Sequence, residues 1–310
     1  MAQPLLLHSL TELRVLIRAC LEAAGATAIL EIGSESGSFT RELLEFAGER
    51  DGALTCVEPQ PTLELERLDS QHEAFRLIHG RSPEALEGLA ACDAYVIDGD
   101  HNCWTVAREL AHLHEAAVVA ERPALAVLHD VSWPCARRDQ YYAPDALPAD
   151  ALHPHSWDHG SVPGRDAAIR GGLRGSGSFS IALQAGGPRN GVLTAVEDFV
   201  AEHADYRFAH IPAVFGVGVL YPAAAPYAEA LAALLGPFDG NPLLEAIERN
   251  RIDLYLRVIE LQDSVSDLGL QQGRLLAEYD RSLTAAEAEA AQLRARLAAR
   301  EQADRDRGSA

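Results

Sequence analysis

Acidic residues and glycines alternate over a short stretch near the start of the chain. Glu31 lies two residues before Gly33, Gly37 follows four residues later, and Glu58 ends the next apolar run. Glycines let the backbone approach a ligand closely, and an acid in the position of Glu58 can accept two hydroxyl hydrogen bonds from a ribose. Carboxylates at Glu31 and Glu35 would repel a pyrophosphate. They suit a ligand that carries an ammonium or sulfonium group, and the G-x-x-x-G spacing differs from the G-x-G-x-x-G of dinucleotide sites.

A strand, a turn, a helix and a second strand must position these residues. Apolar runs at 28–32 and 53–57 predict the strands, and apolar residues at helical spacing over 39–47 predict the helix. The alternation continues along the chain. The further expected elements are a helix over 6–25, a short helix within 59–71, strands at 75–79, 94–97 and 123–128, a helix from Pro83 with Ser82 as its N-cap, helices over 103–119, 190–203 and 222–235, and final strands at 206–211 and 215–221.

Regular alternation of strands and helices predicts an α/β fold with a doubly wound, mainly parallel sheet. Ligands of such sheets bind at the carboxyl ends of the strands. Glu31, Glu58, Asp98 and the pair His129-Asp130 all stand at such ends. One crevice is therefore expected to gather them.

Two segments break the alternation. Residues 137–187 are rich in Gly, Pro, Asp, His and Arg without periodicity, which favours a lid over the crevice, with a disordered loop as the alternative. Residues 242–305 are rich in Ala, Leu, Glu and Arg, which favours a helical hairpin or coiled coil that forms a homodimer or higher homo-oligomer, against a single solvent-bridging helix. The expected domains are an N-terminal helix (1–24), the α/β domain (25–236) and a C-terminal helical region (237–310).

Composition excludes several classes of function. The 310 residues are 48% hydrophobic and carry a net charge of −20 without a single lysine, so nucleic acid and anionic membranes are poor partners. The five cysteines form no C-x-x-C pair and are expected to be reduced thiols of a cytoplasmic protein. No signal peptide and no run of about 18 apolar residues, the length of a membrane helix, is found.

The stretch from Ala28 to Pro59 resembles motif I of the class I S-adenosylmethionine (SAM) methyltransferases. The blocks DGDHN from Asp98 and LHDV from Leu128 resemble the Methyltransferase-24-like group, and the resemblance covers roughly residues 25–221. It implies a Rossmann-like fold with an antiparallel final strand. It also implies methyl transfer from SAM to a small hydroxylated secondary metabolite or sugar. The implied cofactor-binding residues are Glu31, Gly33, Ser34, Gly37, Glu58, Ser82 and Asp98.

The resemblance also implies a metal and a base. Several relatives hold Mg²⁺ with an acid after the fourth strand and an acid pair after the fifth, and here Asp98, His129 and Asp130 occupy those positions. Because imidazole replaces one acid, Mn²⁺, Fe²⁺ or Zn²⁺ fits better than Mg²⁺. His101 stands where catechol-type relatives place a lysine base. It either removes the acceptor's proton or only orients Asp98 or Asp100.

Three alternatives stay open at this point. An NAD-dependent oxidoreductase is disfavoured by the missing G-x-G-x-x-G and the doubled acids. A non-catalytic assembly protein would act through its C-terminal helices. A third possibility keeps SAM but uses it for another group transfer or for cyclisation.

Overall fold

The computed structural model describes residues 6–308, which divide into two compact units. The first unit ends at Arg257 and the second begins at Val258. The last helix, α7 (Pro242–Gly308), runs through both units, so the boundary lies within one element. None of the helices in the described part of the chain is long and apolar enough to cross a membrane.

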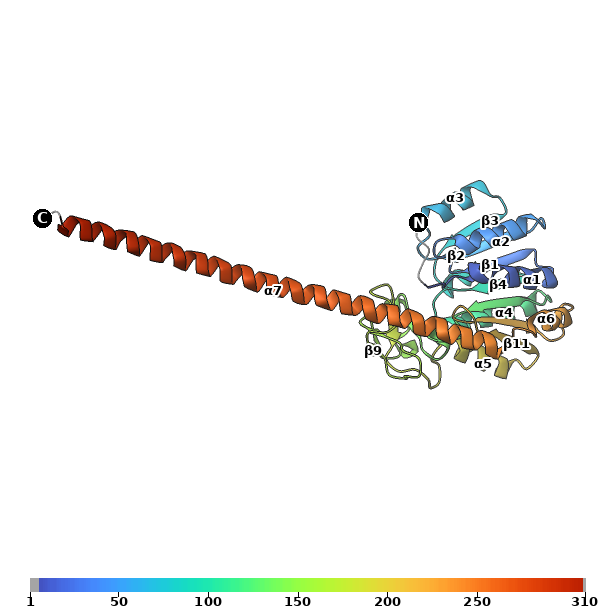
Figure 1. The fold of residues 1–310 in the computed structure, drawn as a ribbon. Coiled ribbons are helices and arrows are strands. Elements are labelled where there is room, and N and C mark those ends of the chain that lie inside the picture. The colour runs from blue at the N-terminus through green and yellow to red at the C-terminus, as the bar shows by residue number, and fades with distance from the viewer. Residues whose placement is uncertain (1–5, 309–310) are drawn as a thin grey trace. The chain divides into compact units, whose positions relative to one another are not determined.

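A seven-stranded sheet forms the centre of the first unit, in the order β11-β12-β5-β4-β1-β2-β3 (Figure 1). Its strands are β1 (Ala28–Ile32), β2 (Ala53–Glu58), β3 (Phe75–His79), β4 (Ala94–Ile97), β5 (Leu125–His129), β11 (Tyr206–Ile211) and β12 (Val217–Pro222). The first five strands pair in parallel, and β12 is antiparallel to both β5 and β11. The predicted doubly wound sheet with an antiparallel final strand is confirmed.

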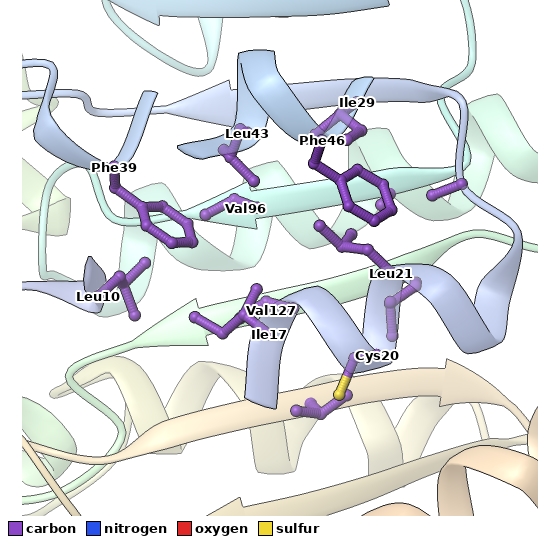
Figure 2. Close-up of a cluster of buried hydrophobic side chains, with 14 of the residues drawn as sticks. Leu10, Ile17, Cys20, Leu21, Ile29, Phe39, Leu43, Phe46, Val96 and Val127 are labelled. Atoms are coloured by element: carbon purple, nitrogen blue, oxygen red, sulfur yellow. The ribbon is translucent and has the colours of Figure 1, made fainter. Parts of the chain in front are cut away.

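Helices cover both faces of this sheet. The helices of the first unit are α1 (Arg14–Ala24), α2 (Ser38–Gly48), α3 (Leu63–Gln71), α4 (Cys103–Val119), α5 (Val192–Glu202) and α6 (Ala228–Leu235). Alternate residues of each strand point to opposite faces. Ile29 therefore joins the core under α1 and α2, whereas Leu30 joins the core under α4 and α5. Figure 2 shows the first core, where Phe46 of α2 lies by Ile29 of β1 and Ile17 of α1 lies by Val127 of β5.

Local sequence explains where these elements begin and end. Ser9 caps a short 3-10 turn (Leu10–Leu13) that leads into α1, and Gly25 ends α1 in a left-handed conformation, as expected. The prediction that Ser82 is an N-cap is wrong, because Pro83 takes the N-cap position of a single 3-10 turn (Glu84–Leu86). All five cysteines are free, and four of them are buried.

The segment expected to be a lid is a small β structure. Strands β6 (Gln140–Tyr141), β10 (Ser180–Ala182) and β7 (His155–Ser156) form one sheet, and β8 (His159–Gly160) pairs with β9 (Ile169–Arg170). Asp139 anchors it, accepting hydrogen bonds from the backbone N–H groups of Cys103 and Gly191 at 2.8 and 2.6 Å. Because these strands are ordered, the disordered-loop alternative is wrong. The sequence did not predict them, because each has only two or three residues and lies among charged and turn-forming residues.

Helix α7 is one continuous helix, where the sequence also allowed a hairpin. Gly269 and Gly273, which weaken a helix, do not interrupt it. Its first turns pack on the first unit through Ile252 and Leu256, both buried. Glu248 accepts the backbone N–H of Phe215 at 2.8 Å, which ties these turns to the segment before β12.

Candidate functional site

A cavity of ≈ 680 Å³ opens at the carboxyl ends of the parallel strands. This volume suits a drug-sized ligand, for which pockets of about 300–1,000 Å³ are usual. The sequence-predicted residues that line it are Glu31, Gly33, Ser34, Glu58, Ser82, Asp98, His101, His129 and Asp130. Gly37 does not line it and instead begins α2 in a left-handed conformation, with a φ of 77°.

The glycine turn after β1 is held by the acid after β2. One oxygen of the Glu58 carboxylate accepts the backbone N–H groups of Ser34 and Glu35 at 3.0 and 3.3 Å, and the other accepts that of Gln60 at 3.0 Å. A carboxylate has about four acceptor sites. The oxygen that receives only the N–H of Gln60 therefore keeps capacity for a further donor, such as a ligand hydroxyl.

Gly33 is required by its neighbours in the fold as well as by any ligand. Its φ is 80°, and an added Cβ would lie 2.3 Å from the carbonyl oxygen of Asp98. The turn after β1 therefore touches the backbone at the end of β4. The sequence predicted this glycine for ligand approach, and the contact with Asp98 gives a second reason for it.

Glu31 differs in charge from the sequence-based expectation. Its side chain is buried on β1, and burial, with the nearby charge of Asp98, raises its pKa to about 8. Without a ligand it is therefore mainly neutral at pH 7, not the carboxylate assumed from the sequence. One of its oxygens, Oε2, has no hydrogen-bond partner among the described residues. A buried, unpartnered oxygen on the cavity wall is suited to a charged donor from a ligand.

Asp98, His129 and Asp130 form a compact cluster with one ligand atom each, all within 4.8 Å of one another. Nδ1 of His129 lies 3.0 Å from Asp98 Oδ1 and 3.4 Å from Asp130 Oδ2. Its Nε2 donates to the carbonyl oxygen of Val214 at 2.8 Å. That bond leaves Nδ1 as the atom that faces the two carboxylates, the arrangement a metal-binding histidine requires.

The electrostatics of this cluster call for a positive charge. Burial lowers the pKa of His129, but the carboxylates of Asp98 and Asp130 outweigh burial and raise it to about 10. A proton on Nδ1 supplies that charge in the protein alone. A divalent ion can replace the proton, and a set of two carboxylates and one imidazole fits Mn²⁺, Fe²⁺ or Zn²⁺. The residues present therefore fit a metal.

Backbone strain marks the same place. Asp130, Val214 and Phe215 have φ values of 59°, 52° and 63°, in the left-handed region that non-glycine residues rarely adopt. For the β-branched Val214 this conformation is especially unfavourable. Such strain is concentrated at functional sites, where the surrounding structure holds it. Here it fixes both the carbonyl that orients His129 and the carboxylate beside it.

His101 contacts Asp130, whereas the sequence suggested Asp98 or Asp100 as residues it would orient. Its Nε2 lies 3.4 Å from Asp130 Oδ2, and its ring packs near that of Tyr142 at 5.8 Å between centroids. Asp100 instead accepts the backbone N–H of Tyr142 at 3.3 Å. His101 lies on the cavity wall beside the cluster, with Asp130 as its ion-pair partner. Burial raises the pKa of Asp100, and His101 is close enough to offset part of that rise.

Sequence reasoning missed several residues of the cavity wall. Trp104 belongs to the first turn of α4, and its position two residues after DGDHN was a usable signal. Tyr142, Arg174 and Phe179 come from the β structure of 137–187, and Tyr255 comes from α7. No spacing rule joins these distant segments, so the sequence alone offered no route to them.

Ser82 reaches the cavity from the loop after β3, and a buried acid stands behind it. Its hydroxyl donates to Oε1 of Glu109, a fully buried residue of α4. Burial raises the pKa of Glu109 to about 8. Its second oxygen, Oε2, has no partner within the described residues. Glu109 is an acid inside an apolar helix face, and no motif or spacing in the sequence pointed to it.

Comparison with known proteins finds a family model that matches part of the chain. Residues 30–131, about a third of the chain, match a family model described as a methyltransferase domain. This range contains the turn after β1 and the cluster acids Asp98 and Asp130. No curated protein sequence matches the chain.

Three solved structures are among those to which the chain is similar. The O-methyltransferase TomG from Streptomyces achromogenes, crystallised with SAM, is 15% identical over 69% of this chain and 80% of its own, with a TM-score of 0.40. Podospora anserina PaMTH1, bound to S-adenosylhomocysteine (SAH), is 14% identical over 67% and 76%, with a TM-score of 0.41. A Bacillus cereus O-methyltransferase with SAH is 13% identical over 69% and 81%, with a TM-score of 0.40.

The strand order, the crevice at the strand ends and the family match define a Rossmann-like methyltransferase domain. Residues 30–131 are thus similar to a methyltransferase domain, which agrees with the resemblance to class I SAM-dependent methyltransferases seen in the sequence.

Proposed function

We propose that this protein transfers the methyl group of SAM to a hydroxyl of a small acceptor, a secondary metabolite or sugar, with a divalent metal bound at the cluster. One observation carries the proposal. A single cavity joins the acid-lined turn after β1 to the cluster of Asp98, His129 and Asp130. Donor and acceptor can therefore occupy neighbouring parts of one site.

The donor half of the cavity suits the groups of SAM. Glu58 keeps acceptor capacity for a ribose hydroxyl of SAM. Ser82, in the loop after the neighbouring strand β3, lies where the adenine base of SAM would bind. The unpartnered oxygen of Glu31 is suited to the donor's ammonium group. A bound cation would lower the pKa of Glu31 and make it the carboxylate that the pair requires.

The acceptor half suits a hydroxylated compound. Asp98, His129 and Asp130 would hold a divalent ion, which would bind and acidify an acceptor hydroxyl. His101 lies beside Asp130 and is placed to take the hydroxyl proton as the oxygen attacks the methyl carbon and the sulfonium becomes a thioether. Tyr142 and Phe179, whose rings are 6.0 Å apart, offer an aromatic wall to the acceptor.

Two other functions fit less well. An NAD-dependent oxidoreductase would place a pyrophosphate beside the acids Glu35 and Glu58 of the cavity wall, where it would be repelled. An assembly protein without catalysis gives no role to the strained backbone at Asp130 and Val214. Use of SAM for another group transfer would keep the donor half and change only the role of His101.

Ligand binding and turnover test the proposal in sequence. SAH should raise the melting temperature of the protein and NADH should not, and Glu58→Ala should abolish the SAH effect. Labelled SAM with a panel of small diols and phenols should then yield a methylated product in the presence of Mn²⁺ or Mg²⁺. Stabilisation by NADH and not by SAH would refute the proposal at the first step.

A further inference from the structure

Helix α7 carries an exposed apolar stripe. Its members follow alternating steps of four and three residues, and all are exposed except the half-buried Val258: Leu254, Val258, Leu261, Val265, Leu268, Leu275 and Tyr279. The side chains of Leu261, Val265 and Leu268 are 66%, 68% and 58% exposed. The only polar residue in this register is Gln272, which stands between Leu268 and Leu275.

The stripe is distinct from the face that α7 uses against the first unit. Ile252 and Leu256 are 6% and 9% exposed, whereas Leu254, between them, is 60% exposed. Residues two apart on a helix point about 200° away from each other. The stripe thus remains available for a partner while the helix packs through its other side.

The residue types specify the kind of partner. In heptad terms, Val258 and Val265 take position a, and Leu254, Leu261, Leu268 and Leu275 take position d. β-branched residues at a with leucine at d favour two parallel strands. Gln272 falls at a, where a parallel pair brings the two copies together and their amides can bond each other. An antiparallel pair would place each amide against an apolar residue, which costs stability.

We propose that the stripe from Leu254 to Tyr279 binds the same stripe of a second copy of this chain as a parallel, two-stranded coiled coil. The paired length is about 39 Å at 1.5 Å per residue. Gln272 fixes the register. Arg257, Ser264, Gln271 and Glu278, at position g, face Gln262, Gly269, Leu276 and Leu283, at position e, so no like charges meet across the seam.

The molar mass of the full-length protein, measured by light scattering, tests this coiled-coil contact with two matched leucine variants. The wild type should have twice the 33.4 kDa mass of one chain. Leu268→Glu should give a monomer. Leu270→Glu should stay dimeric, because Leu270 is equally exposed, at 63%, but stands at the outer position f. A monomeric or trimeric wild type, or equal effects of the two variants, would overturn the proposal.

Disulfide trapping tests the orientation. Gln272→Cys should form a covalent dimer under mild oxidation, because identical a positions meet only in the parallel pairing. Asp267→Cys, at the outer position c, and the wild type with its five native cysteines should not. If Gln272→Cys is a dimer by mass yet fails to cross-link, the pairing is antiparallel and the proposal is wrong.

A second observation concerns the cavity, and its interpretation depends on the proposed function. Ser82 lines the cavity and donates its hydroxyl proton to Glu109, so its oxygen presents lone pairs to a ligand. Glu109 itself does not line the cavity. Its carboxyl oxygen Oε1 lies 3.8 Å from the position of a Cβ added at Gly99, behind the loop after β4.

We infer that Glu109 is a positioning residue that makes Ser82 an acceptor for the exocyclic amine of the donor's purine. The site then distinguishes an amino group from an oxo group at that position. A buried polar group left facing the wrong partner costs about 1–3 kcal/mol, so SAH should bind at least ten-fold more tightly than its deaminated analogue, S-inosylhomocysteine.

Calorimetry with these two compounds tests the assignment. Ser82→Ala and Glu109→Leu should bring the two affinities within about three-fold, whereas Glu109→Gln, which still accepts the Ser82 proton, should keep the preference. A purely structural role for Glu109 would weaken both compounds equally in Glu109→Leu. That result would overturn the inference. Failure of the wild type to bind SAH would instead overturn the proposed function.

Discussion

Nε2 of His129 donates to the carbonyl oxygen of Val214 at 2.8 Å, which directs the other nitrogen of the ring towards Asp98. Val214 can offer this carbonyl only because its backbone adopts the left-handed conformation before β12. The last antiparallel strand pair thus orients a ring at the end of β5.

This orientation predicts metal binding. The wild type should bind one Mn²⁺ per chain, measured by calorimetry or by electron paramagnetic resonance. Asp130→Asn should weaken binding by at least ten-fold, because it removes one of two charges that balance the ion. Glu45→Gln, an exposed acid on α2, is the control and should bind normally. If the wild type ignores Mn²⁺, Fe²⁺ and Zn²⁺ alike, His129 keeps its proton and the metal site does not exist.

His101 should control turnover without controlling binding of the donor. His101→Gln should lower kcat by about 10²–10⁴-fold, the usual contribution of a general base. The dissociation constant of SAH should be unchanged. His72→Ala, at the exposed end of α3, should affect neither quantity. An unaltered kcat in His101→Gln would assign this histidine to the support of Asp130 alone.

Glu31 should matter for the donor more than for the fold. Because the buried side chain is mainly neutral in the protein alone, Glu31→Gln should change the melting temperature little. It should weaken SAH by about 10-fold or more, since a charge-assisted hydrogen bond contributes about 1.5–3 kcal/mol. Equal affinity for SAH in the variant and the wild type would remove Glu31 from the cofactor site.

Asp93 predicts a pH-dependent part of the stability. Burial would raise its pKa, but hydrogen bonds from Ala28 and Thr27, with Arg122 nearby, lower it below the usual value. A depressed pKa stabilises the fold above the unfolded value of about 3.9, and this contribution is lost as the pH falls through the folded value.

Urea unfolding at two pH values measures this contribution. Asp93→Ala should be less stable than the wild type by about 1–2 kcal/mol at pH 7, a typical loss for hydrogen bonds to a charged group. The difference should shrink towards pH 3. Asp150→Ala, an exposed acid of the 137–187 segment, should show little change. A difference that stays constant with pH would show that the loss comes from packing.

The sequence predicted the sheet and most of the cavity floor because both follow from local patterns. Apolar runs that end at or beside Glu31, Glu58 and Asp98 mark strands, and parallel strands bring their ends together. It could not predict the partner of His101 or the neutral state of Glu31. Those depend on burial and on distances between segments far apart in the chain.

The strands within residues 137–187 could not be predicted from the sequence, for a related reason. Its strands are only two or three residues long, and a pattern that short has no measurable period. The prediction that Ser82 is a helix N-cap was wrong because it was inferred from residue order alone. The Ser82 hydroxyl instead donates a hydrogen bond to Glu109, 27 residues later in the chain. Side-chain partners at such separations are set by the fold.

The contact between Gly33 and the carbonyl of Asp98 leaves no room for even one methyl group. The turn that would hold the donor and the backbone of the acid that would help hold the acceptor are therefore in direct contact. A side chain at position 33 would push these two walls apart, so the spacing between donor and acceptor depends on this glycine.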